Sequence, residues 1–215
     1  MALPHPSIIR SWYGTIDRRV AGGKVYCNLT LDEMSIGKLI EFDGSKYHGY
    51  VDIETGDSDD SMPPATYALV LVVVAINENW KIPIANFMIN GLSGEEKANI
   101  VQTALIKVHE VGVIIPSITW DGPSFNFGMF KALGAALHSG IIKPTFPHPS
   151  NSDIKVIVLL DVSYMLKHVR NSFASIGELR NHKGEVIRWS FIEEWYSIQE
   201  KEGLRAGTKL RKAAH

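Results

Sequence analysis

Two aspartates stand at the ends of segments whose residue pattern predicts β-strands. Asp32 lies near the end of an alternating stretch at residues 27–34, and Asp121 directly follows the apolar segment Val113–Trp120. Carboxylates held close together repel each other unless a cation bridges them, and Mg²⁺ or Mn²⁺ is the natural candidate. Two such ions about 3.5 to 4 Å apart activate a water or a DNA 3′ hydroxyl for in-line phosphoryl transfer. The two aspartates are therefore candidate ligands for nuclease or strand-transfer chemistry.

Each aspartate also has a purely structural interpretation. Asp121 precedes Gly122-Pro123-Ser124, a sequence typical of a helix start, where aspartate commonly caps the free backbone N–H groups. Asp32 has no helix directly after it, so its structural alternative is a solvated strand end. Spacing alone does not decide between these interpretations and metal binding.

The elements that must position these residues follow from hydrophobic periodicity and from capping signals. Ser93-Gly94-Glu95-Glu96 predicts a capping box, and Gly112 predicts the end of the helix that it begins. Five consecutive apolar residues before Asp161 predict a strand that is buried on both faces. The expected strands are 27–34, 46–53, 67–76, 81–89, 113–120 and 155–160, and the expected helices are 93–112, 124–137, 164–173 and 189–212, with a loop at 55–64.

The order of these elements predicts an α/β fold of the RNase H-like type, with a mixed sheet flanked by helices. In that fold the first strand lies beside the fourth, and the fourth beside the fifth, all parallel, through right-handed crossovers. Ligand sites of open α/β sheets lie at the carboxyl ends of parallel strands. Asp32 and Asp121 are therefore expected to converge in one cleft.

Composition and charge narrow the classes of protein that remain. The chain has 215 residues, a net charge of −1 and one cysteine, Cys27, which excludes an internal disulfide and a zinc site of several cysteines. Its sequence predicts neither a membrane span nor a signal peptide, so an intracellular protein is expected. Residues 28–60 carry a net charge of −7 and residues 155–215 a net charge of +4. Most of these charged residues are expected to lie on the solvated surface. The histidines show no metal-ligand spacing: His48, His109, His138, His148 and His168.

Six collinear segments resemble the P-element transposase family, including its THAP-domain-containing relatives. They are Leu31-Asp32-Glu33-Met34-Ser35-Ile36, Gly49-Tyr50-Val51-Asp52, Trp80-Lys81-Ile82-Pro83-Ile84, Gly91-Leu92-Ser93-Gly94-Glu95-Glu96, Thr119-Trp120-Asp121-Gly122-Pro123-Ser124 and Leu166-Lys167-His168-Val169-Arg170-Asn171. The resemblance implies a nuclear, metal-dependent cut-and-paste DNA transposase that binds transposon ends and forms a homo-oligomer. It also implies GTP as a ligand of the complete family members.

The resemblance assigns catalytic roles to particular residues. Asp32 matches the first catalytic aspartate and Asp121 the second. The family's third acid is a glutamate beyond a GTP-binding insertion, so it is expected to lie outside this chain, and neither Glu193 nor Glu194 is assigned to it. Asp161 is the one obvious internal substitute and a possible additional ligand, but the family does not use this position as its main third ligand. Tyr164 also replaces the histidine that the family usually has three residues after this aspartate.

The resemblance also divides the chain into three parts. Residues 1–24 are expected to be a remnant of the helical segment before the catalytic domain, 25–175 the RNase H-like core, and 176–215 the helical start of the GTP-binding insertion. Lys167, Arg170 and Asn171 are candidates for contact with a phosphate or a nucleotide, the alternative being a cationic helix face.

The leading hypothesis for function is a transposase catalytic domain that lacks its third acid. The alternatives are a non-catalytic, domesticated fragment that binds DNA or protein partners, and a guanine-nucleotide-binding fragment.

Overall fold

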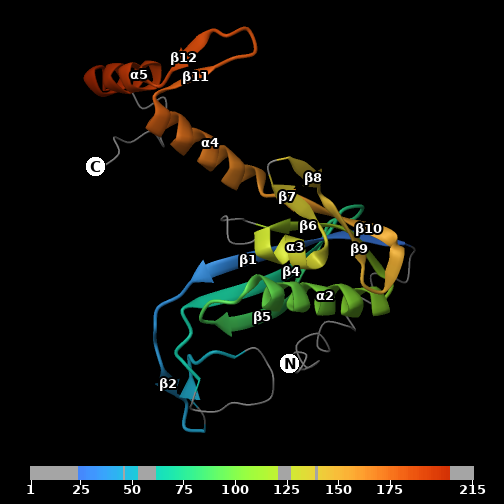
Figure 1. Ribbon diagram of the computed structural model, residues 1–215. Coiled ribbons are helices and arrows are strands. Elements are labelled where there is room, and N and C mark those ends of the chain that lie inside the picture. Colours follow the sequence, from blue (N-terminus) through green and yellow to red (C-terminus); the bar gives the residue numbers. More distant parts are fainter. Residues whose placement is uncertain (1–23, 46, 53–61, 121–126, 139, 204–215) are drawn as a thin grey trace. The chain divides into compact units, whose positions relative to one another are not determined.

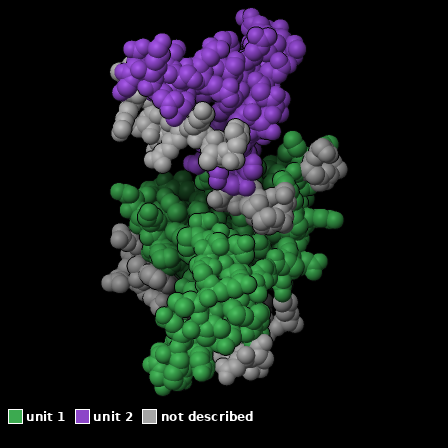
Figure 2. Space-filling model, turned by 90° about the vertical axis from the view of Figure 1, so that its left-hand side faces the viewer, with its two compact units in different colours: residues 1–161 green, residues 162–215 purple. Residues whose placement is uncertain are grey.

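The computed structural model describes residues 24–45, 47–52, 62–120, 127–138 and 140–203. The predictions for residues 1–23, for the loop within 55–61, and for Asp121 with the helix start that follows it lie outside these ranges. Contacts divide the chain into two compact units, unit 1 at Met1–Asp161 and unit 2 at Val162–His215 (Figure 2). The predicted core boundary at residue 175 stays a prediction. None of the helices described is long and apolar enough to span a membrane.

Unit 1 is built on a six-stranded mixed sheet in the order β5-β4-β1-β6-β10-β9 (Figure 1). The long central strand β1 pairs with β4 in antiparallel and with β6 in parallel orientation, and β10 pairs with β6 in parallel. The predicted neighbours, the first, fourth and fifth long strands, are thereby confirmed. The strands of the sheet are β1 (Val25–Ser35), β4 (Tyr67–Ala75), β5 (Lys81–Ile89), β6 (Val113–Trp120), β9 (Thr145–His148) and β10 (Asn151–Leu160).

Two helices cover one face of this sheet (Figure 1). Helix α2 (Gly94–Glu110) begins with the predicted capping box, in which Ser93 accepts from the Glu96 backbone N–H and the Glu96 carboxylate accepts from the Ser93 N–H. Together with α3 (Phe127–Leu133), it packs on the alternate strand residues that point to this face, such as Leu29 and Leu31. This layer is the hydrophobic core of unit 1.

The two helices approach each other closely at glycine. A Cβ on Gly94 would lie 2.6 Å from the Gly128 carbonyl carbon, so a side chain there would force the two backbones apart. Helix α3 is shorter than predicted: it ends at Leu133 because Gly134 adopts a φ of +96°, and β7 (Ala136–His138) follows, paired with β8 (Ile141–Lys143).

The predicted strand at 46–53 is wrong as a single element. In its place, β2 (Glu41–Phe42) and β3 (Tyr47–His48) form a short hairpin, and Tyr50 and Asp52 make isolated bridges to Pro64 and Met88. Gly49 separates these pieces with a φ of +101°, and a Cβ there would collide with the Leu39 carbonyl. The pattern of alternating residues did not reveal this change in backbone direction.

The prediction that the strand before Asp161 is buried on both faces is also wrong. Val156 and Val158 are buried, whereas Ile157 is 43% and Leu159 46% exposed. The described helices of unit 1 pack on one face only, so an apolar run was mistaken for a strand covered on both faces.

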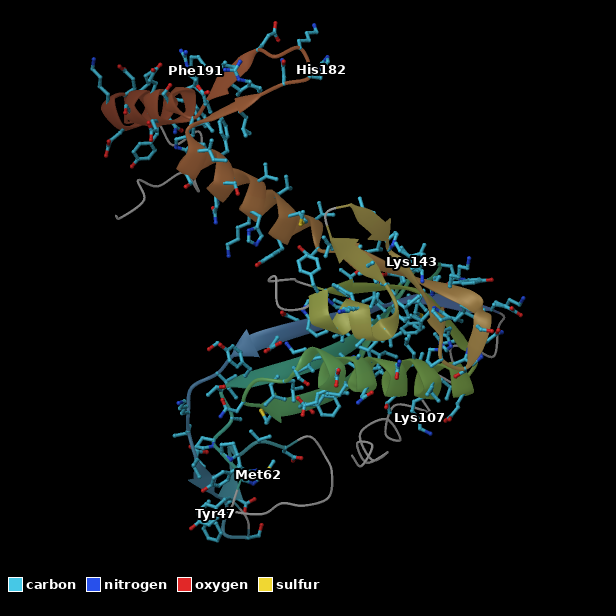
Figure 3. All side chains as sticks on the ribbon, viewed as in Figure 1. Tyr47, Met62, Lys107, Lys143, His182 and Phe191 are labelled. Carbon is cyan, nitrogen blue, oxygen red and sulfur yellow. The ribbon has the colours of Figure 1, made fainter. Side chains whose placement is uncertain are left out.

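Unit 2 contains α4 (Val162–Ile176), a hairpin of β11 (Glu178–Arg180) and β12 (Val186–Arg188), and α5 (Ser190–Lys201). Helix α4 confirms the prediction of a helix at 164–173. The sequence pattern missed the hairpin, whose tip carries His182 (Figure 3). The predicted last helix is correct from Ser190 to Lys201, and residues 204–212 lie outside the described ranges.

Candidate metal centre

Three parallel strands of unit 1 are in register at the point where β6 and β10 end, and β1 continues beyond that point to Ser35 beside β4. Leu31 of β1 is the partner of Trp120 of β6, and Trp120 is also the partner of Leu160 of β10. In the sequence, an aspartate follows each of these three residues: Asp32, Asp121 and Asp161. The parallel arrangement thus places these three positions side by side, at the carboxyl ends of β6 and β10, and open α/β sheets bind ligands at the carboxyl ends of their strands.

The structure places two of these aspartates. Asp32 continues β1, pairs across the sheet with Val70 of β4, and is exposed. Because neighbouring residues of a strand point to opposite faces, Asp32 lies on the face away from the buried Leu31 and therefore away from α2. Asp161 is partly buried, and its backbone N–H donates to the Trp120 carbonyl at 3.2 Å, which holds the ends of β10 and β6 together.

The prediction that Asp32 and Asp121 face one cleft stays a prediction, since Asp121 lies outside the described residues. Within those residues, no three histidine, cysteine, aspartate or glutamate side chains gather closely enough to hold a metal ion. The fit of a divalent cation therefore depends on the chemistry of the donors and on the register of the strands. Carboxylate oxygens at adjacent parallel strand ends suit Mg²⁺ or Mn²⁺.

A polar network lies on the same face of the sheet as Asp32. The hydroxyl groups of Ser117 and Thr119 lie 2.8 and 3.2 Å from the Asn28 Oδ1 atom, and Asn28 Nδ2 donates to Thr30 Oγ1 at 3.0 Å. Asn28 and Ser117 are register partners, as are Thr30 and Thr119. Hydrogen bonds between side chains thus join β1 to β6 at Asn28, four residues before Asp32.

A buried ion pair lies on the opposite, helix-covered face at the same strand ends. Lys97 of α2 is 4% exposed, and its ammonium lies 2.6 Å from the Glu33 carboxylate and 5.5 Å from the centroid of the Trp120 ring. None of the predictions made from the sequence included this cluster. The signal was present, because Lys97 interrupts the apolar side of α2 that continues through Val101, Ala104 and Val108.

The candidate nucleotide-contacting residues all lie on α4 of unit 2. Arg170 donates through Nε and Nη2 to Asn171 Oδ1, at 3.1 and 2.9 Å, and Lys167 lies one turn earlier. Tyr164 packs edge-on against His168 with ring centroids 4.2 Å apart. Both interpretations of these residues, nucleotide contact and a cationic helix face, stay predictions.

Two histidines that are far apart in the sequence meet in unit 1. The rings of His109 and His148 are 4.9 Å apart, and His148 is 2% exposed. The Ser150 backbone N–H donates to His148 Nδ1, so the neutral ring carries its proton on Nε2, which has no hydrogen-bond partner among the described residues. Burial lowers the pKa of His148, the neighbouring His109 lowers it further, and the Leu105 backbone acts in the opposite direction.

The fold and the strand-end aspartates define the class of protein as an RNase H-like α/β domain followed by a second unit. Residues 7–134 match the family described as TNP-like, RNase H N-terminal domain, and residues 163–215 match the TNP-like, GTP-binding insertion domain. Because the first match covers more than half of the chain, this chain belongs to the TNP-like family of P-element and THAP9-like transposases.

Named relatives agree with the family assignment. The chain is 27% identical to the human DNA transposase THAP9 over 222 residues, which covers 94% of the chain and 24% of that protein. It is 25% identical to the transposable element P transposase of Drosophila melanogaster over 178 residues, which covers 83% of the chain and 21% of that protein. The chain thus spans less than a quarter of each of these relatives.

A solved structure supports the fold independently. The Drosophila P element transposase strand transfer complex matches the chain with a TM-score of 0.61 at 21% identity, over 91% of the chain and 42% of the solved chain. The RNase H-like fold predicted from the order of elements is confirmed.

Proposed function

We propose that unit 1 is the amino-terminal part of a metal-dependent DNA transposase core, in which Asp32 and Asp121 hold Mg²⁺ or Mn²⁺. The supporting observation is the register of the strands: Leu31 and Trp120 are partners in parallel strands, and an aspartate follows each of them. The bound cation would stabilise charge that develops on a phosphodiester. Asp32 and Asp121 would supply its ligands, while the β1–β6 pairing would set their separation.

The test is Mn²⁺ binding measured by titration calorimetry. Asp32→Ala and Asp121→Ala are each expected to weaken Mn²⁺ binding by about tenfold or more, since neither carboxylate alone makes an adequate site. Asp153→Ala is the matched control, because Asp153 is an exposed carboxylate in β10, eight residues from the aligned strand ends. Unchanged binding in both site variants would refute the proposal.

Asp161 is proposed as an additional ligand at the same edge of the sheet. Its backbone is tied to Trp120, and its strand neighbours β6. Asp161→Asn retains the size of the side chain and its hydrogen-bonding capacity while removing its negative charge. If Asp161 is a ligand, this variant weakens Mn²⁺ binding further in the Asp32→Ala background, whereas no further loss would exclude it.

A non-catalytic function is the second candidate, because the described residues gather no group of three metal-ligating side chains. Two aspartates are expected to hold at most one ion well, and the two-ion mechanism needs more ligands. The 215-residue chain is therefore expected not to cleave a labelled DNA duplex efficiently in Mn²⁺. Robust cleavage that disappears in Asp32→Ala would contradict this expectation and would make Asp161, Glu193 and Glu194 the next residues to mutate.

DNA as partner, self-association and nuclear location are proposals that derive from the transposase family. A gel-shift titration with duplex DNA tests the first, and sedimentation at several protein concentrations tests the second. Imaging of the tagged chain in cells tests the third.

For unit 2 we propose contact between α4 and a guanine nucleotide, supported by the match to the GTP-binding insertion domain and by the clustering of Lys167, Arg170 and Asn171 on one helix. Fluorescent GTP titrated against wild type and Lys167→Ala/Arg170→Ala tests it. Equal binding by the two proteins would exclude these residues.

A further inference from the structure

The cluster of Lys97, Glu33 and Trp120 occupies a special place in unit 1. Glu33 directly follows Asp32, Trp120 directly precedes Asp121, and Lys97 lies in the first turns of α2. The cluster therefore connects the two strand ends that carry the proposed metal ligands to the helix that covers them. The contacts of Lys97 with Glu33 and Trp120 lie on the sheet face opposite Asp32.

Stability alone gives no reason for this arrangement. The other buried positions of α2 are apolar: Ala98, Ile100, Val101, Ala104, Leu105 and Val108. Removing an ammonium and a carboxylate from water is costly, and an apolar pair of similar size often serves a core as well or better. What the ion pair adds is direction, since the 2.6 Å contact ties the side chain of the residue after Asp32 to Lys97 of α2.

We infer that Lys97 is a positioning residue, which through Glu33 and Trp120 sets the orientation of the ends of β1 and β6 for metal binding. This inference rests on the proposed metal site. It goes further by assigning a role to charged residues that lie on the far side of the sheet from the ion. Outer residues that orient metal ligands typically change metal affinity by about 10- to 100-fold when they are mutated.

The experiment compares metal affinity with stability in a double variant. Lys97→Met and Glu33→Gln each remove one charge of the Lys97–Glu33 ion pair, so either single variant is expected to be destabilised. The double variant Glu33→Gln/Lys97→Met removes both charges at similar volume, and it is expected to regain a melting temperature close to that of wild type. We nevertheless expect it to bind Mn²⁺ about tenfold more weakly than wild type.

Lys107→Met is the matched control. Lys107 lies on the same helix (Figure 3) and pairs with Glu110 at 3.0 Å, but it is only half-buried and lies about three turns along the helix from Lys97. This variant is expected to bind Mn²⁺ as wild type does. Lys97→Arg retains the charge and is expected to bind more tightly than the double variant. A folded double variant with wild-type Mn²⁺ affinity would overturn the inference.

Amide hydrogen exchange at Leu31 to Met34, measured without metal, separates this inference from the proposed function. Faster exchange in the double variant than in Lys107→Met would support the positioning role even if wild type binds no Mn²⁺, a result that would refute the metal site alone. Unchanged exchange in the double variant would refute the positioning role.

Discussion

Unit 1 and unit 2 differ in how far their apolar side chains are buried. In unit 1 the sheet, α2 and α3 enclose a continuous core, and the largest fully buried side chains belong to it, among them Trp120, Phe130 and Leu105. In unit 2, none of the fifteen described residues of α4 is buried, and Leu166 is 65% exposed. Among the described residues of α5, Gln199 is the one that is buried. Phe191, at the start of that helix, is 61% exposed (Figure 3).

This difference indicates where the stability of the chain lies. An isolated helix of about 15 residues is marginal in water, because most helical stability in proteins comes from packing of the apolar side. Unit 1 is therefore expected to have a larger free energy of unfolding than unit 2. The predicted metal site belongs to the more stable unit, and the predicted nucleotide-contacting residues belong to the less stable one.

The largest expected effect comes from matched leucine truncations. Leu105→Ala in α2 removes a side chain that is fully buried, and it is expected to lower the free energy of unfolding by about 3 kcal/mol. Leu166→Ala in α4 is expected to change it by less than about 0.5 kcal/mol. Urea denaturation followed by circular dichroism measures both. A loss for Leu166→Ala as large as that for Leu105→Ala would show that α4 is buried in solution, and it would break the comparison.

A smaller effect is expected where α2 meets α3. Gly94→Ala places a Cβ within 2.7 Å of two backbone atoms of α3, so it is expected to destabilise unit 1 by about 2 kcal/mol. Gly128→Ala is the control on the other side of the contact, since its Cβ would meet its nearest neighbour at 3.7 Å. It is expected to be neutral or stabilising by up to about 0.5 kcal/mol, because alanine favours a helix. Thermal denaturation of both variants is the measurement. Equal losses of stability in the two variants would argue against the close approach of the Gly94 and Gly128 backbones.

The smallest effect concerns pH and again belongs to unit 1. The pKa of His148 in the folded protein is lowered from its ordinary value of 6.5, so the unfolded chain binds more protons in this range. Its contribution to stability is present above pH 6.5 and is lost as the pH falls through the folded-state pKa. The melting temperature is therefore expected to fall between pH 7 and pH 5, and to fall less in His148→Phe. Melting curves of the two proteins with the same pH dependence would exclude His148 as the cause.

The sequence predicted the metal site from the positions of aspartates at the ends of individual predicted strands. Asp32 was found because alternation indicated the strand that contains it, and the parallel pairing of β1 with β6 confirmed the placement of that strand. Lys97 and Glu33 were not found, since no local pattern pairs residues 64 positions apart. The meeting of His109 and His148 was missed for the same reason.

Local backbone changes account for the wrong element predictions. Gly49 divides the expected strand at 46–53, and Gly134 ends α3 earlier than its apolar spacing suggested. Hydrophobic periodicity reports which side of an element is apolar, but it does not report where a glycine takes the chain into a left-handed conformation. The hairpin of β11 and β12 was missed because its strands are only three residues long.

The sequence by itself determined the order of the long elements, the capping box of α2 and, through the resemblance of its motifs, the transposase family. These depend on residue types and on spacings along the chain. Only the tertiary structure decided that one face of the sheet carries the helices, that Asp32 points to the other, and that a buried lysine lies behind the strand ends. These features depend on contacts between residues that are distant in the sequence. Strand pairing and the packing of helices on the sheet determine those contacts, and local propensity does not.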